Sequence, residues 1–247
     1  MKSIYMKICF LGISCIVALE ASAQSPVTTV YPIKAGQQIN LIFDYPVIRV
    51  STWEKNEVSV TSRVNINDHE NDGAFSLEEQ TENGALTLTD HIKDLHQLPR
   101  RYTVVRDGKK TTFRSKEAYI QASKESGVEK SYEGLDIDIG VEIKVPANAV
   151  LDIRSVYGLV ELADFNTPAT IDATYGGIDA RLVAAHTGKI QATTHYGQID
   201  SDLDLKLTDH KEDRFFKSIT AEPGKGPAYS FTSAYGKIYL RKQVIGY

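Results

Sequence analysis

The chain has few residues suited to thiol chemistry and no catalytic motif that we recognise. Only two of its 247 residues are cysteines. Both, Cys9 and Cys15, lie near the N-terminus, so the rest of the chain has no thiol for a disulfide, a zinc–thiolate site or a cysteine nucleophile. Phosphate loops, dinucleotide fingerprints, zinc-protease motifs and hydrolase elbows are missing as well. We therefore expect no catalytic, cofactor-binding or metal-binding residues and no cofactor.

Long apolar runs are also scarce. Beyond the N-terminus no segment approaches the ~18 consecutive apolar residues of a membrane-spanning helix. Hydrophobic residues make up 42% and charged residues 24% of the chain, which is typical of a folded globular protein and excludes a disordered chain or a transmembrane bundle.

The N-terminus has the pattern of an export signal. Lys2 and Lys7 precede an apolar run over residues 8–19, and Ala21-Ser22-Ala23 follows it. A basic start, a short apolar run and small residues at the end are typical of a secretory signal peptide. We expect cleavage after Ala23, with lipoprotein processing at Cys15 as the alternative, although its preceding residues are a poor lipobox. The mature chain, residues 24–247, is then expected to be a single exported domain that is periplasmic, outer-membrane-associated or secreted.

Charge is weakly negative overall and unevenly distributed. The formal net charge is −4, which gives no reason to expect nucleic acid as a partner. Residues 93–130 nevertheless contain ten basic and five acidic residues. We interpret this segment as a basic insertion, either a solvated excursion or a docking surface for an acidic partner. Within it, residues 102–106 and 110–114 predict a hairpin turned at Asp107-Gly108, and residues 116–123 predict a helix.

Most of the remaining chain alternates between apolar and polar residues, which predicts strands. The clearest strand candidates are residues 39–43, 47–53, 58–66, 86–89 and 135–145. Since strand follows strand with almost no helical periodicity, we expect an all-β protein.

A repeat appears in the C-terminal half when the chain is aligned on Tyr-Gly. The four units are centred on Tyr157-Gly158, Tyr175-Gly176, Tyr196-Gly197 and Tyr235-Gly236. The first three are spaced by about 20 residues, a period that suits one coil of a β-solenoid. A second insertion, residues 207–227, lengthens the last interval. The sequence thus predicts a single-domain β-solenoid, with right-handed parallel coils in which each turn stacks on the previous one.

The columns of this alignment predict which side chains face the core. Ile153, Ile171, Ala192 and Phe231 occupy one inward column, Ser155, Ala173, Thr194 and Ser233 a second, and Val160, Ile178, Ile199 and Ile238 a third. Because strand residues alternate, each repeat tyrosine shares the phase of the inward residues before it. We expect the ladder Tyr157, Tyr175, Tyr196 and Tyr235 to stack on the core side and to stabilise the fold. The alternative is an outward ladder that binds sugar rings. The glycine after each tyrosine predicts a corner that needs positive φ or close backbone approach.

Two groups of acidic residues are candidate metal sites. Glu161, Asp179 and Asp200 form an outward column, which must be solvated, paired with basic neighbours such as Arg181, or loaded with calcium, and which in a glycan-active enzyme could transfer protons. The loop from Asp68 to Glu79 reproduces much of a twelve-residue calcium loop. Its position 3 is Glu70, and its flanks predict strands instead of helices, so we interpret it as a solvated turn. His91 and His96 lack metal-ligand spacing.

Several segments resemble a known family. Residues 47–60, residues 145–153 and the repeated Gly-x-Ile-Asp turns are similar to the bacterial "putative adhesin" family of exported β-solenoid domains. The resemblance implies a location in the cell envelope and a binding or structural role, without catalytic residues to carry over. We therefore expect a non-enzymatic envelope or cell-surface protein that recognises a glycan or a protein. The alternatives are a glycan-active lyase or hydrolase on a β-helix scaffold and a structural periplasmic partner protein.

Overall fold

The computed structural model describes residues 26–243. The predicted signal peptide and the alternative lipidation site at Cys15 lie outside this range. Within it the chain is all-β, as predicted, with one short α-helix. None of the helices in this part of the chain is long and apolar enough to cross a membrane.

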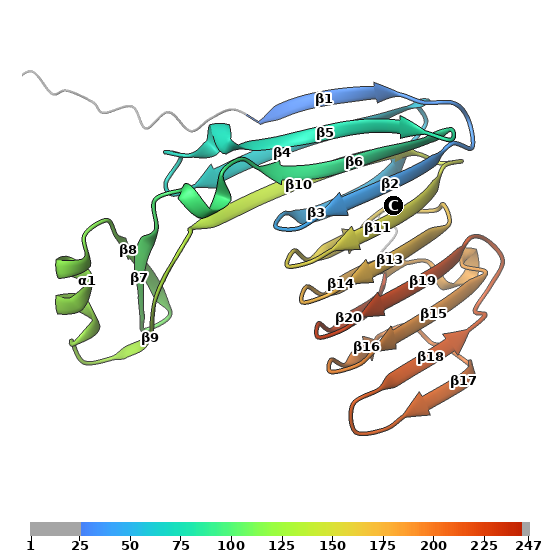
Figure 1. Ribbon diagram of the computed structural model, residues 1–247. Helices are drawn as coiled ribbons and strands as arrows, with labels where there is room; N and C mark the ends of the chain where they lie inside the picture. The colour runs from blue at the N-terminus through green and yellow to red at the C-terminus, as the bar shows by residue number, and fades with distance from the viewer. Residues whose placement is uncertain (1–25, 244–247) are drawn as a thin grey trace, which may run out of the picture.

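Two large sheets face each other and form the body of the molecule (Figure 1). Sheet A has the order β1-β4-β10-β3-β12-β14-β20-β16, and sheet B has the order β17-β18-β15-β19-β13-β11-β2-β6-β5. The strands of sheet A are β1 (Val27–Pro32), β3 (Val47–Trp53), β4 (Glu57–Ile66), β10 (Ile137–Pro146), β12 (Val160–Leu162), β14 (Ile178–Leu182), β16 (Ile199–Ser201) and β20 (Ile238–Lys242). Those of sheet B are β2 (Gln38–Phe43), β5 (Phe75–Glu82), β6 (Ala85–Ile92), β11 (Val150–Ser155), β13 (Ala169–Ala173), β15 (Lys189–Thr194), β17 (Leu207–Glu212), β18 (Lys217–Ala221) and β19 (Ala228–Ser233).

The central part of both sheets is parallel and is built from coils. In each coil a strand of sheet B leads through a corner into a strand of sheet A; the coils are β2/β3, β11/β12, β13/β14, β19/β20 and β15/β16. Pairing between coils is in register with the alignment on Tyr-Gly, so that Ile153 lies beside Ile171 and Ile171 beside Phe231. Each unit aligned on Tyr-Gly therefore contributes one strand to sheet B and one strand to sheet A.

The coils do not stack in sequence order, so the prediction that each turn stacks on the previous one was wrong. The last coil, β19/β20, lies between β13/β14 and β15/β16, with parallel pairing on both sides (Figure 1). The segment 207–227 explains the difference. It forms the hairpin β17–β18, which pairs antiparallel with the far edge of β15, and the chain then returns to place β19 between β13 and β15.

The core lies between the two sheets and follows the predicted columns. Ile153, Ile171, Ala192 and Phe231 are fully buried, as are Val160, Ile178 and Ile238. Ser155, Ala173, Thr194 and Ser233 are also buried, whereas Ile199 in the edge strand β16 is half-buried. Their alternation with outward polar residues is what makes these segments strands, since each strand buries one face only.

A small lobe projects from the end of sheets A and B that carries β4, β10 and β6 (Figure 1). It contains the three-stranded sheet β8-β7-β9, with β7 (Arg101–Arg106), β8 (Lys109–Phe113) and β9 (Val128–Gly134), and the helix α1 (Lys116–Ser123). The predicted hairpin is present, with positive φ at Asp107 and Gly108 as a two-residue turn requires. The predicted helix is present too, and the Ser115 hydroxyl caps it by accepting a hydrogen bond from the Ala118 N–H at 3.1 Å. Three short 3₁₀ helices complete the described chain: η1 (Asp72–Ala74), η2 (Leu95–Gln97) and η3 (Ala184–His186).

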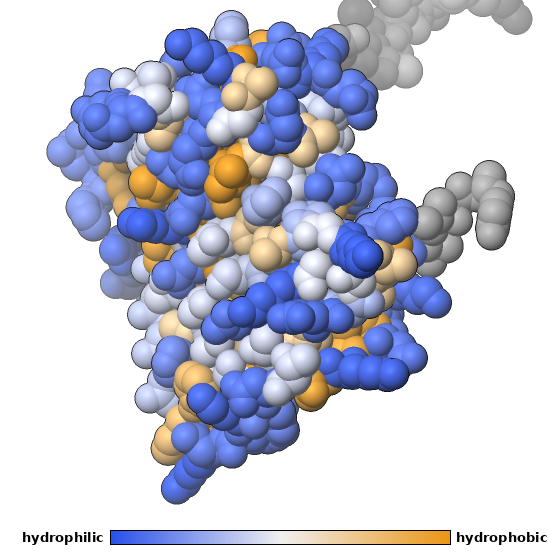
Figure 2. All heavy atoms as spheres, turned by 90° about the vertical axis from the view of Figure 1, so that its right-hand side faces the viewer, coloured by the Kyte–Doolittle hydropathy of each residue, from blue (hydrophilic) through white to orange (hydrophobic). Residues whose placement is uncertain are grey.

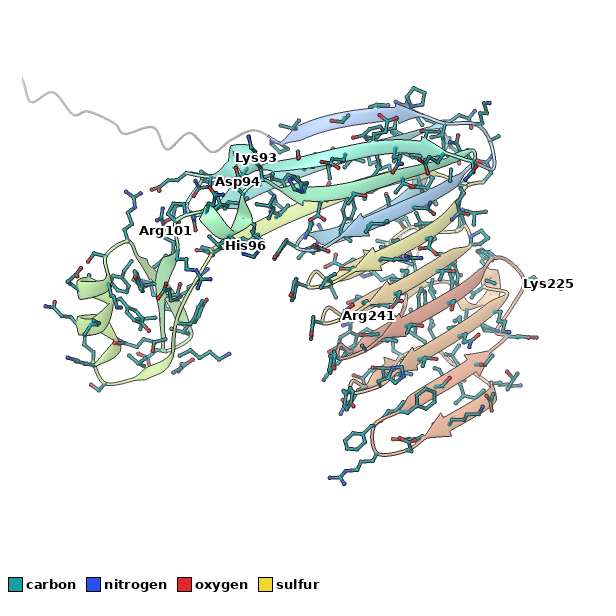
Figure 3. The ribbon with its side chains drawn as sticks, viewed as in Figure 1. Lys93, Asp94, His96, Arg101, Lys225 and Arg241 are labelled. Atoms are coloured by element: carbon teal, nitrogen blue, oxygen red, sulfur yellow. The ribbon has the colours of Figure 1, made fainter. Side chains whose placement is uncertain are left out.

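Opposite to the corners, the connecting loops form the other edge of the stack. Lys225 marks this side in Figure 3, and Figure 2 views the molecule from it. Hydrophilic residues cover most of that surface, and the hydrophobic ones form small separate patches (Figure 2).

The glycine of each Tyr-Gly corner is required by close backbone approach. A Cβ on Gly176 would lie 1.9 Å from the carbonyl oxygen of Gly158, one on Gly236 would lie 1.9 Å from that of Gly176, and one on Gly197 would lie 1.9 Å from that of Gly236. The φ angles of these glycines are not in the left-handed region. Of the two explanations that the sequence allowed, contact between neighbouring coils is thus the correct one.

We predict that Gly176→Ala destabilises the protein by at least about 3 kcal/mol, because the new methyl group forces two paired coils apart. The melting temperature should fall by roughly 10 °C in thermal unfolding. Gly134→Ala is the control, since nothing lies within 4 Å of the position that a Cβ would take there. Equal stability of the two variants would contradict the close approach.

Candidate functional site

The repeat tyrosines form an exposed ladder along the corner edge of the stack. The exposed fractions are 56% for Tyr157, 55% for Tyr175, 52% for Tyr235 and 60% for Tyr196. The prediction that these rings lie on the core side was wrong.

The rings face outward because the alternation of a strand ends where the strand ends. β11 stops at Ser155, and the following residues bend into the corner, so the phase of Ser155 does not extend to Tyr157. The Ser155 hydroxyl instead donates a hydrogen bond to the Gly158 carbonyl at 2.9 Å and holds the corner from inside. Ser233 of β19 instead donates to the neighbouring coil, to the carbonyl of its corner glycine Gly176, at 3.1 Å.

Two further aromatic residues extend the row, which runs Tyr45, Tyr157, Tyr175, Tyr235, Tyr196 and Phe215 in space. Tyr45 lies at the β2–β3 corner and stacks on Tyr157, and Phe215 in the β17–β18 turn packs against Tyr196. Neither was predicted from the sequence. Tyr45 had a usable signal, since buried Leu41, Phe43 and Ile48 surround it at the repeat spacing, but Pro46 replaces the glycine. Pro46 is tolerated because this is the first corner of the row, and its own carbonyl faces Gly158.

Stacking determines which part of each ring a ligand can reach. From Tyr45 to Tyr196 neighbouring ring centroids are 5.1 to 5.4 Å apart, with interplanar angles of 7° to 24°. Each inner ring therefore has both faces covered by its neighbours, and its solvent-exposed part is the edge. Tyr196 and Phe215 are tilted by 49° and end the regular stack. We call these six residues the aromatic ladder.

The residues beside the five tyrosines of the aromatic ladder are mostly uncharged, whereas Arg214 lies over the Phe215 ring, 5.1 Å from its centroid. The positions before the rings hold Asp44, Val156, Thr174, Ala234 and His195, and the positions two residues after them hold Val47, Leu159, Gly177, Lys237 and Gln198. Across the five Tyr corners, Asp44 and Lys237 are thus the flanking carboxylate and ammonium groups. A strip of aromatic edges with few charges is typical of the centre of a recognition surface.

One carboxylate closes the end of the aromatic ladder. In the second coil the N–H groups of Val156 and Tyr157 donate to the carbonyls of Phe43 and Asp44, at 3.0 and 2.8 Å. Among residues 26–243 the first coil has no such neighbour, and its Asp44 and Tyr45 N–H groups donate to the two oxygens of Asp90, at 2.8 and 3.4 Å. Burial raises the pKa of Asp90 in spite of these bonds. Burial also raises the pKa of Tyr45, and Tyr157, Asp44 and Asp90 act in the same direction.

The acidic column predicted on sheet A is divided and paired. Glu161 accepts from Arg49 Nε at 2.7 Å, and Asp179 accepts from Arg241 Nε at 2.9 Å. Arg241, not Arg181, is thus the partner of Asp179. Tyr239 lies between Asp179 and Asp200, because β20 separates β14 from β16. The three carboxylates do not form one site.

The loop after β4 is a left-handed turn that contacts the lobe. Asn67, Asp68 and His69 all have positive φ. Asp72 accepts the Ile66 N–H at 2.7 Å and contacts His69 Nδ1 at 2.7 Å. Glu70 is paired with Arg101 and Arg114 of the lobe region. Since Glu70 and Asp72 are engaged elsewhere, the oxygens of this turn do not converge as a calcium loop requires.

The two histidines noted in the sequence lie in separate elements. His91 lies on β6, and His96 lies in η2 near Lys93 and Asp94, at the root of the lobe (Figure 3). Over residues 26–243, no cluster of three or more histidine, cysteine, aspartate or glutamate side chains could hold a metal ion.

Comparison with known proteins finds a structural neighbour but no matching family. No family model and no curated protein matches the chain. One solved structure, described as a putative cell adhesion protein from Clostridium sporogenes, is similar with a TM-score of 0.42 and 7% identity, covering 89% of this chain and 100% of that chain. The resemblance to the putative adhesin family thus has no matching family model behind it.

The burial of Asp90 predicts how the stability of the protein depends on pH. Because folding raises the pKa of Asp90, the native protein binds more protons than the unfolded chain, and stability falls as pH rises through the raised pKa. Asp90→Asn removes this titration. We expect the variant to lose stability relative to wild type most at acidic pH, with a smaller difference at neutral pH in urea unfolding. A difference that grows with pH would mean that the two backbone hydrogen bonds outweigh burial.

Proposed function

We propose that this protein is a non-enzymatic binding protein that contacts its partner along the aromatic ladder. The supporting observation is a row of six aromatic residues whose four repeat tyrosines are all more than half exposed. Exposed tyrosine rings have no part in forming the core, and they are costly to leave in water. Tyrosine is enriched in recognition surfaces because it combines a large apolar body with a polar hydroxyl.

The ring geometry favours some partners over others. A sugar ring stacks on the face of an aromatic ring, yet the inner faces of the aromatic ladder are covered at 5.1 to 5.4 Å. Phenol hydroxyls and ring edges remain accessible along the row. We infer that the partner is an extended polymer, a protein or a glycan, that lies along the row and is held by its edges and hydroxyls.

The wider context of the proposal comes from the sequence. We interpret the five parallel coils as a short β-solenoid of residues 24–247, with insertions near 93–130 and 207–227. The signal-like N-terminus supports export to the envelope or the cell surface, where the working class of function is adhesion. The pairing of Glu161 and Asp179 with arginines gives no support to a glycan-active enzyme, and no observation on the described residues specifically favours a purely structural partner protein.

The experiment that tests the proposal is a glycan array combined with a pull-down from cell-envelope extract, using the mature chain. A variant with Tyr157→Ser, Tyr175→Ser and Tyr235→Ser should lose the hits found with wild type. Tyr132→Ser is the matched control, because this tyrosine is 44% exposed on β9 of the lobe. Hits that survive in the triple variant would contradict the proposal. A glycan that is cleaved during incubation would favour the enzyme alternative.

A single substitution separates binding from folding. Tyr175→Ala removes two stacked pairs, each worth about 0.5 to 1.5 kcal/mol, but creates no cavity because the ring is exposed. We expect the free energy of unfolding to fall by about 1 to 3 kcal/mol, while affinity for any confirmed partner falls at least about tenfold. Binding that declines only in proportion to the unfolded fraction would make the aromatic ladder a stabilising feature instead.

A further inference from the structure

At the end of the stack that contains β1 and β5, the two sheets differ in their number of strands. Outward from the coil β2/β3, sheet A continues with three strands, β10, β4 and β1, whereas sheet B continues with two, β6 and β5. β1 pairs with β4, and β5 pairs with β6, so each of β1 and β5 has a free edge within the described chain. No strand formed by residues 26–243 takes the position in sheet B that would face β1.

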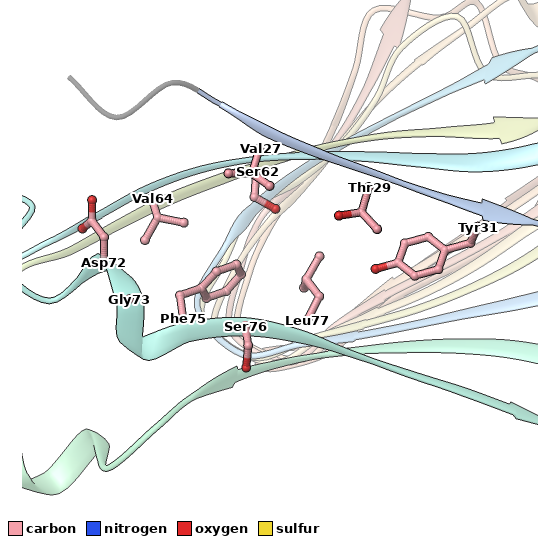
Figure 4. A pocket seen from close by; sticks show the side chains of 10 residues that line it. All are labelled: Val27, Thr29, Tyr31, Ser62, Val64, Asp72, Gly73, Phe75, Ser76 and Leu77. Atoms are coloured by element: carbon pink, nitrogen blue, oxygen red, sulfur yellow. The ribbon is translucent and has the colours of Figure 1, made fainter. Parts of the chain in front are cut away.

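A groove occupies this position. Its volume is about 350 Å³. Val27, Thr29 and Tyr31 line it from β1, and Phe75 and Leu77 line it from β5 (Figure 4). The side chains from the two strands face each other across the opening. Val27 is 59% exposed although it lies on the inner face of sheet A.

The length of the groove and the spacing of its lining residues match those of one β-strand. Apart from Asp72, Gly73 and Ser76, its lining residues occur at every second position of β1, β4 and β5, as on the inner faces of a sandwich. From Val27 to Tyr31 the groove extends for roughly 13 Å at about 3.3 Å per residue. An occupant that fills it needs apolar side chains at alternate positions and a backbone that pairs with a free edge.

Charge beside the groove specifies one more feature of the occupant. The carboxylate that lines the groove, Asp72, is engaged with Ile66 and His69, and a second carboxylate, Glu79, lies beside the groove on β5. Glu79 follows Phe75 and Leu77 on the same face of β5. Burial raises the pKa of Tyr31, and the nearby Glu79 carboxylate acts in the same direction. Among residues 26–243 Glu79 forms no ion pair, unlike Glu70. A lysine or arginine of the occupant would supply the missing countercharge at this end.

A second copy of the chain fits poorly. At the far end of the stack sheet B carries two strands, β18 and β17, beyond the coil β15/β16, whereas the groove has room for one. β17 is exposed along its whole length and carries Asp209, His210, Lys211 and Glu212. Charges along an edge strand oppose pairing with another sheet.

We propose that the groove between β1 and β5 is a docking site for an extended segment of a partner protein, which adds to sheet B beside β5. The segment has two apolar side chains at alternate positions, which cover Phe75 and Leu77, followed at the next alternate position by a basic residue, which meets Glu79. This site is independent of the aromatic ladder, which lies along the corners of the coils.

The test uses a short synthetic peptide with valine at alternate positions and lysine in place of the last one. It should bind the mature chain saturably and protect the amides of residues 75–82 from hydrogen exchange. Glu79→Lys should weaken binding at least about tenfold. Glu78→Lys is the matched control, because it makes the same charge change on the outer face of β5 and should leave affinity unchanged. A peptide with glutamate instead of lysine should prefer the Glu79→Lys variant, which also shows that this variant is folded.

Absence of saturable binding by the lysine peptide would overturn the proposal. So would equal losses in the Glu78→Lys and Glu79→Lys variants, which indicate nonspecific charge attraction. Protection of β5 by concentration-dependent self-association without peptide would also overturn it, in favour of a second copy.

Discussion

The contact between the corner glycines and the carbonyls of neighbouring coils sets the geometry of the whole stack. A Cβ at Gly158 would lie 1.6 Å from the Pro46 carbonyl oxygen, and at the following corners the corresponding distance is 1.9 Å. At this approach neighbouring coils can pair only in one register, since a shift by one residue would bring a side chain into the contact. The aliphatic columns of both sheets then align, and the core follows from this alignment.

The aromatic ladder is a second consequence of the same contact. A tyrosine precedes each of these glycines, so a register fixed at the glycine also fixes the separation of the rings, at 5.1 to 5.4 Å. Close packing and surface exposure are therefore divided between adjacent residues. The glycine holds the coils together, and the tyrosine presents a regular, uncharged row to solvent. Asp90 ends the row by taking the part that the carbonyls of a neighbouring coil play at the other corners.

The alternation of apolar and polar residues predicted many of the strands and their buried faces. It did not predict the order in which the coils stack. The strand candidates listed from the sequence, the buried columns through Ile153 and Val160, the lobe hairpin and the helix over residues 116–123 were predicted correctly. Strands β1, β5, β9, β17 and β18 were not predicted, and the interpretation of residues 68–79 as a turn was wrong for its second half, because β5 begins at Phe75. The order of the coils was also predicted wrongly, because every coil has the same register pattern and the hairpin β17–β18 is long enough for the chain to return past β15. The carboxylate column failed for the same reason, since Tyr239 of the inserted coil divides it. The outward direction of the tyrosines was missed because the alternation was extended beyond the end of each strand. Tyr45 was missed because Pro46 replaces the glycine that marks the other corners.

The central claim is that the last coil lies between two earlier ones and makes the aromatic ladder continuous. Residues 24–247 contain no cysteine, so pairs of introduced cysteines report neighbouring strands directly. Asp172 lies opposite Thr232, and Thr232 lies opposite Thr193, at the ~4.8 Å spacing of paired strands, which a disulfide can bridge. We expect rapid disulfide formation in Asp172→Cys/Thr232→Cys and in Thr193→Cys/Thr232→Cys, but none in Asp172→Cys/Thr193→Cys, whose strands are separated by β19. A disulfide in the last variant alone would show that the coils stack in sequence order and would contradict the claim.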